Sequence, residues 1–193
     1  MPVFKLKDPR PDICVGLSDE VLADALEPKK GRGLARRFLL IHMSPTPLGL
    51  RFPFLMVEAK AGATGGNLYR AQNQAAVGGS AALQIFRRLS DLQYAQNSDQ
   101  ESSGNLEAGG HSPHTPSALT PYVSFSIAAE GPVHELRLHF RRCCEEDYYM
   151  GCIRTWRTTV ESDSLDLLRH LWEVLRWGND ELKGAIIESL QAL

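Results

Sequence analysis

The pattern of hydrophobic and polar positions in the first third of the chain predicts strands with one short helix between them. The apolar run at residues 52–57 is typical of a buried strand, and it leads into Glu58-Ala59-Lys60. Residues 12–17 predict another strand, and Ser18, which two acidic residues follow, predicts the N-cap of a short helix. Residues 38–43 predict a further strand. These segments together favour a mixed β-sheet.

A long helix is predicted after Lys60, from about Asn67 to Leu92. Its apolar residues recur at steps of three and four, which is the spacing of one helix face. The middle of the helix is rich in glycine, alanine and serine, and such small side chains allow another element to approach closely. We therefore expect this helix to lie against the sheet.

The second half of the chain predicts a hairpin, one more strand and two helices. Polar and apolar residues alternate on both sides of the turn Glu130-Gly131-Pro132, which is typical of a β-hairpin. The predicted elements are strands at 122–127, 133–140 and about 148–155, an amphipathic helix at 163–177 that ends at Gly178, and a last helix capped by Asp180. The apolar positions that predict packing of the first of these helices are Leu165, Leu168, Leu171, Trp172 and Leu175. The fold class is therefore α/β in the broad sense (α+β), a central mixed sheet flanked by helices.

Composition predicts one domain with one disordered insert. A chain of 193 residues that is 43% hydrophobic and 23% charged is ordinary for one globular domain, so a single domain over 1–193 is predicted. Residues 96–120 are rich in Ser, Gly, Asn, Asp, Glu and Pro and hold few large apolar side chains. Such a segment buries too little surface to offset its ordering entropy, which predicts a disordered insert.

Charge and hydropathy limit the partners. The formal net charge of −2 excludes a general basic field of the kind that dominates non-specific binding to nucleic acid, so any such contact must be local. The amino terminus lacks a signal-peptide pattern and no apolar run reaches membrane-spanning length, which predicts an intracellular protein, nuclear or cytoplasmic, with no membrane partner. The four cysteines do not have the spacing of a zinc site, and reduced thiols are expected.

The candidate chemistry lies in Pro11-Asp12 and in Glu58-Ala59-Lys60. Side chains alternate along a strand, so Glu58 and Lys60 point to the same face. Asp12 and Glu58 offer the carboxylate oxygens that Mg²⁺ prefers, and Lys60 offers positive charge for a phosphate or for the attacking water. Gln72 or Gln74 of the long helix can complete such a pocket. A strand-end ion pair between Glu58 and Lys60 is the simpler structural alternative.

Three segments carry a resemblance to a known family: residues 4–13 with Pro11-Asp12, residues 52–60 with Glu58-Ala59-Lys60, and residues 71–76. In this combination the chain resembles the PD-(D/E)XK nuclease superfamily, and more closely the PD-(D/E)XK nuclease-like domains common in fungal proteins. The resemblance implies a restriction-endonuclease-like core that cleaves DNA or RNA with Mg²⁺ or Mn²⁺. It implies that Asp12 and Glu58 bind the metal, that Lys60 is the catalytic lysine, and that Gln74 or Gln72 is the catalytic helix glutamine.

Two other functions remain open from the sequence. The first is a catalytically inactive module that keeps the fold and binds a nucleic acid, a protein partner or a second copy of the chain. The second is metal-dependent processing of a small phosphorylated molecule. The slight excess of acidic over basic residues favours the inactive module, whereas the presence of Asp12, Glu58 and Lys60 together favours the nuclease.

Overall fold

The computed structural model describes residues 11–25, 50–62, 65–101, 123–142 and 147–192. The elements are β1 (Ile13–Ser18), α1 (Asp19–Ala25), β2 (Leu50–Lys60), α3 (Leu68–Glu101), β3 (Val123–Glu130), β4 (Val133–Arg141), β5 (Tyr148–Arg157), α4 (Glu161–Trp177), the π-helical η2 (Gly178–Leu182) and α5 (Lys183–Gln191). Ser18 Oγ accepts a hydrogen bond from the backbone N–H of Glu20, so it caps α1 as its sequence predicts. The strand predicted at 38–43 lies outside the described residues.

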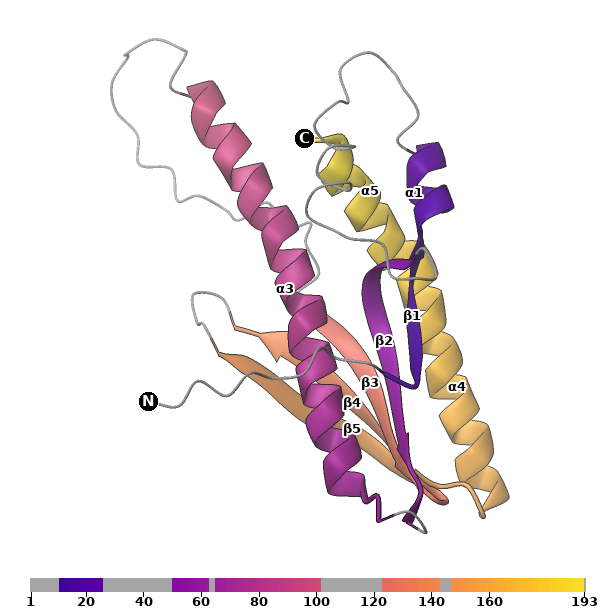
Figure 1. Ribbon diagram of the computed structural model, residues 1–193. Helices are drawn as coiled ribbons and strands as arrows, with labels where there is room; N and C mark the ends of the chain where they lie inside the picture. Colours follow the sequence, from indigo (N-terminus) through magenta and orange to yellow (C-terminus); the bar gives the residue numbers. More distant parts are fainter. Residues whose placement is uncertain (1–10, 26–49, 63–64, 102–122, 143–146, 193) are drawn as a thin grey trace, which may run out of the picture. The chain divides into compact units, whose positions relative to one another are not determined.

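The strands form one sheet in the order β1-β2-β3-β4-β5 (Figure 1). β2 and β3 run parallel, and α3 supplies the crossover that a parallel pair requires. β3, β4 and β5 are antiparallel neighbours. The register places Glu58 of β2 opposite Ala128 of β3, and Lys60 opposite Glu130. This mixed sheet with its helices confirms the predicted α+β class, whereas the restriction-endonuclease-like core stays a prediction.

Contacts within the chain divide it into two compact units. The first contains Met1–Gly16, Pro53–Leu83 and Val123–Leu175, and the second contains Leu17–Phe52, Gln84–Tyr122 and Arg176–Leu193. The first unit therefore holds most of the sheet, the first half of α3 and most of α4. The assignment of a single domain stays a prediction.

In the first unit, glycines bring α3 close to one face of the sheet. A Cβ atom on Gly78 would lie 2.8 Å from the sulfur of Met56 on β2, and one on Gly79 would overlap the ring of His139 on β4. Ala71 and Ala75 of the same helix are fully buried. The small residues in the middle of the predicted helix thus do allow close packing.

A buried polar pair lies beneath this part of α3. Ser126 Oγ of β3 is 2.7 Å from Nε2 of His139, and both side chains are buried. Burial, with a smaller contribution from the positive charge of Arg137, lowers the pKa of His139 to about 4. The imidazole is therefore neutral at physiological pH, and its hydrogen bond to Ser126 satisfies a ring nitrogen that water cannot reach.

The lowered pKa of His139 predicts that the protein loses stability in acid. Between about pH 6.5 and about pH 4 the unfolded chain takes up a proton at His139 that the folded chain does not, so acidification through this window favours unfolding. The loss attributable to His139 should total about 3 kcal/mol, at 1.36 kcal/mol for each pKa unit. Denaturant unfolding of wild type and of His139→Gln at several pH values in this range measures the part of the stability loss that is due to His139. A His139 ring that titrates near pH 6.5 by NMR in the folded protein would contradict the prediction.

α4 packs on the opposite face of the sheet through one indole. Trp156 of β5 is buried, and its Nε1 donates a 2.8 Å hydrogen bond to Asp166 of α4. Arg154 pairs with the same carboxylate at 3.0 Å. The predicted packing face of this helix was wrong in part, because Leu165, Leu168, Trp172 and Leu175 are exposed. The buried side chain of α4 is that of Val174, and Asp166 is on the helix face that contacts Trp156 of β5.

In the second unit, a buried arginine and a pair of stacked aromatic rings connect separate segments of the chain. Arg51 is buried, and its Nε pairs with Asp19 of α1 at 2.7 Å. The rings of Phe52 and Phe86 stack with centroids 6.2 Å apart. Gln93 Nε2 of α3 donates to the backbone oxygen of Ser189 in α5 at 3.2 Å.

Two predicted boundaries differ from the structure. α3 continues to Glu101, so residues 96–101 of the predicted insert are helical, and the rest of the insert lies outside the described residues. Composition misled here because glutamine and glutamate are good helix formers even where apolar residues are scarce. α4 ends at Trp177, directly before Gly178 as predicted, but the helical backbone continues through η2 into α5, so Asp180 caps no helix. The residues on both sides of η2, Trp177 and Lys183, keep right-handed helical angles.

Candidate functional site

Asp12 is fixed to β2 by its backbone and by its side chain. Its backbone N–H donates to the carbonyl oxygen of Val57 at 3.0 Å, and its Oδ2 accepts from the backbone N–H of Ala59 at 2.7 Å. Asp12 directly precedes β1, which is the edge strand next to β2. Two hydrogen bonds therefore hold a carboxylate from the start of the chain beside Glu58-Ala59-Lys60.

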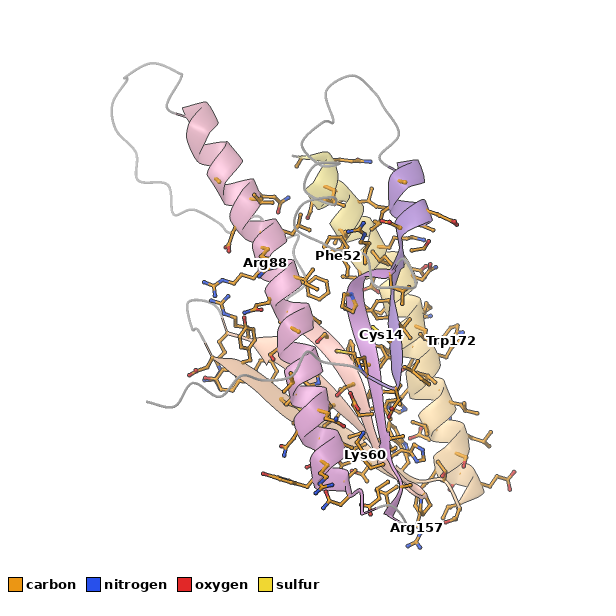
Figure 2. The ribbon with its side chains drawn as sticks, viewed as in Figure 1. Cys14, Phe52, Lys60, Arg88, Arg157 and Trp172 are labelled. Carbon is orange, nitrogen blue, oxygen red and sulfur yellow. The ribbon has the colours of Figure 1, made fainter. Side chains whose placement is uncertain are left out.

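The structure brings Asp12, Glu58 and Lys60 together. Lys60 Nζ lies 3.5 Å from Oε2 of Glu58 and 4.0 Å from Oδ2 of Asp12, so one ammonium group faces both carboxylates. Glu58 and Lys60 share a face because they are two positions apart on β2. Lys60 lies near the end of β2, beside the first turns of α3 (Figure 2).

Glu58 is buried at an energetic cost. Only 3% of its surface is exposed. Burial raises the pKa of Glu58, the ammonium of Lys60 opposes this rise, and the negative charge of Asp12 adds to it. The folded state therefore disfavours the ionised form of Glu58, and a single lysine compensates it only in part. A raised carboxyl pKa of this kind occurs both at functional sites and in structural ion pairs.

The contacts of α3 separate the two candidate glutamines. Gln72 Nε2 donates to Oε2 of Glu135 on β4 at 2.9 Å, and it is therefore tied to the far side of the helix from β1. Gln74 lies one turn before Gly78, the glycine that contacts Met56 of β2. Residues four apart share a side of a helix, so exposed Gln74 lies on the side toward β2. Of the two, Gln74 is the one placed toward Glu58 and Lys60.

Glu130 is a neighbouring acid that the sequence reasoning missed. It is the register partner of Lys60 on β3, and its Oε2 accepts from the backbone N–H of Leu68 at 2.7 Å. The carboxylate thus caps the first turn of α3, where the helix dipole favours negative charge. The pairing of β2 with β3 was the missing information, because Glu130 was predicted as a turn residue of the hairpin.

The described part of the chain contains no cluster of three or more His, Cys, Asp or Glu side chains that could hold a metal ion. Mg²⁺, however, usually keeps several waters and takes only one or two protein carboxylates together with substrate phosphates. Asp12 and Glu58 are two carboxylates that lie near one ammonium, that of Lys60. The side chain of Asp12 is half exposed, whereas that of Glu58 is buried.

The fold and the site define an α+β domain with three charged side chains gathered beside the edge strand. The chain belongs to the DUF7924 family, a domain of unknown function whose sequence profile matches residues 2–190. No curated protein and no solved structure matches the chain significantly. Among the helices described, none combines the length and the apolar character needed to cross a membrane.

Proposed function

We propose that this chain is a metal-dependent nuclease that hydrolyses phosphodiester bonds of nucleic acid at Asp12, Glu58 and Lys60. One observation carries the proposal: side chains from two distant segments meet at a single ammonium, 3.5 Å from Glu58 and 4.0 Å from Asp12. Two carboxylates lie near that one ammonium. Glu58 is also buried, so the ammonium compensates its negative charge only in part. A divalent cation supplies the missing positive charge.

The roles follow from the chemistry of each side chain. Asp12 and Glu58 would hold Mg²⁺ or Mn²⁺, and the ion would supply Lewis-acid stabilisation of charge on the phosphate. Lys60 has three N–H donors and no acceptor, so it can stabilise negative charge that develops on the phosphate oxygens. Gln74 can accept a hydrogen bond from the attacking water through its amide oxygen.

A second candidate, an inactive binding module, is favoured by one contact. Oδ2 of Asp12 already accepts from the N–H of Ala59 at 2.7 Å, so this carboxylate also serves as a structural clamp between the start of β1 and β2. If clamping were its whole role, the site would bind no metal. The fold would then serve to bind a protein or a nucleic acid.

Cleavage assays with labelled single- and double-stranded DNA and RNA test the proposal. With Mg²⁺ or Mn²⁺ we expect cleavage of at least one of these substrates, and with excess chelator we expect none. Titration calorimetry of the same protein preparation should show binding of Mn²⁺. If the folded chain cuts no substrate and binds no metal, the inactive module replaces the nuclease.

A further inference from the structure

The first turn of α3 presents two large side chains to solvent beside the proposed site. Tyr69 is 68% exposed, the highest value among the exposed large hydrophobic side chains in the part of the chain that the structure describes. Arg70, the next residue, is exposed as well. A single exposed aromatic is ordinary on a protein surface, so its neighbours decide whether it has a role.

A short chain of contacts links Arg70 to Lys60. Arg70 Nη1 donates to the carbonyl oxygen of Gly65 at 3.3 Å. The next residue, Gly66, packs against Lys60 so closely that a Cβ atom there would lie 2.9 Å from Lys60 Cβ. Helical side chains tilt toward the helix N-terminus, so Tyr69 and Arg70 lean toward this loop at the end of β2.

The phase of the helix gives the two residues different positions. Arg70, Gln74 and Gly78 follow one another at four-residue steps, and Gly78 contacts Met56 of β2. Eight residues turn a helix by about 80° beyond two full turns, so Arg70 lies on the flank of α3 on the side of β2 and is turned toward solvent. Tyr69 is rotated by about 100° from it across the outer surface of the same turn, toward the flank that carries Gln72 three residues later.

The negative charge of the site favours a further cation near Lys60. Asp12, Glu58 and Glu130 gather near Lys60, and together they repel a polyanionic substrate unless positive charge meets the phosphates that flank the cleaved one. A guanidinium matches a phosphate with two parallel hydrogen bonds. Arg70 is a suitable donor because the hydrogen bond to Gly65 uses only one of its five N–H groups.

We infer that Arg70 binds the phosphate next to the cleaved one, that Tyr69 stacks on the base of that flanking nucleotide, and that the site takes single-stranded nucleic acid. The inference deepens the proposed function and rests on it for the position of the cleaved phosphate. In a duplex the base faces are covered by their neighbours, whereas an unpaired base can lay its face on a tyrosine ring. An exposed tyrosine beside a phosphate-binding arginine therefore favours a single strand.

Fluorescence anisotropy with a labelled single strand of about 12 nucleotides tests the inference. Ca²⁺ replaces Mg²⁺ to keep the strand intact, which a gel verifies. Tyr69→Ala should weaken binding roughly tenfold or more, and Tyr69→Phe should retain it, because stacking needs the ring alone. Arg70→Gln should weaken binding and lower the slope of log K against log salt by about 0.7, the share of one phosphate contact in a single strand.

Matched controls are an arginine and an aromatic residue away from the site. Arg88→Gln, at an exposed position farther along α3, and Trp172→Ala, at an exposed position on α4, should leave affinity unchanged. Affinity that is unchanged in Tyr69→Ala, or equal for duplex and single strand, overturns the inference even if the chain cleaves nucleic acid. A chain that binds single strands through Tyr69 and Arg70 without cutting them overturns the nuclease and upholds this surface.

Discussion

Glu58→Gln should abolish nuclease activity and Lys60→Ala should lower it strongly, and both variants should stay folded. Glu58→Gln deletes one of two carboxylates available to the metal, so Mn²⁺ binding by calorimetry should be lost together with cleavage. Lys60→Ala keeps both carboxylates and should still bind Mn²⁺, but kcat should fall roughly 10²–10³-fold because a donor to the developing charge is missing. Glu173→Gln, at an exposed position on α4, is the control and should change neither quantity.

Glu58→Gln should also change stability: it should make the protein more stable although it removes activity. Since the pKa of Glu58 is raised in the folded state, its contribution to stability is present at low pH and is lost as the pH rises through the folded-state pKa. Glu58→Gln removes this loss, so at neutral pH the inactive variant should unfold at a higher temperature than wild type without metal. Mn²⁺ should raise the unfolding temperature of wild type and not that of the variant. If Glu58→Gln lowers stability at neutral pH, Glu58 is a structural partner of Lys60 and not a strained ligand.

The sheet was largely predictable from the sequence because alternation and apolar runs are local signals. β2 and the hairpin of β3 and β4 lie within a few residues of their predicted positions, and β1 begins one residue later than predicted, directly after Asp12. The ends of the helices were less predictable. Glu101 and Gly178 show why: a polar composition does not exclude helix, and one glycine costs a helix only about 1 kcal/mol, which packing can offset.

The parts of the site that depend on tertiary register could not be read from the sequence. Spacing cannot show that the N–H of Ala59 binds Asp12, or that Glu130 lies beside Lys60, because both contacts depend on which strands are neighbours. The choice between Gln72 and Gln74 depends on how α3 is rotated over the sheet. Contacts of the glycines of α3 with β2 and β4 define that rotation, and no local pattern contains it.

Gly79→Ala should lower the free energy of unfolding strongly, because it adds a methyl group where α3 contacts His139. The added Cβ would overlap Nδ1 and Cγ of His139 and would lie 2.6 Å from Cε1. The ring cannot move away easily, because it is buried and its Nε2 is bonded to Ser126 at 2.7 Å. Overpacking of a core typically costs about 1–3 kcal/mol, and a contact with three ring atoms should fall at the upper end or beyond it. Alanine's better helix propensity returns only about 1 kcal/mol.

Two other glycines give a graded control for this prediction. At Gly78 the new methyl group would meet Met56 at 2.8 Å, and a flexible thioether can shift, so Gly78→Ala should cost less. At Gly184 of α5 a Cβ meets nothing within 4 Å, so Gly184→Ala should stabilise the protein by up to about 1 kcal/mol. Denaturant unfolding should therefore rank the variants Gly184→Ala, Gly78→Ala and Gly79→Ala from most to least stable. In a double-mutant cycle, His139→Ala should recover part of the Gly79→Ala loss, because it removes the ring that the methyl group strikes. Additive losses at Gly79 and His139 would mean that α3 does not pack against His139.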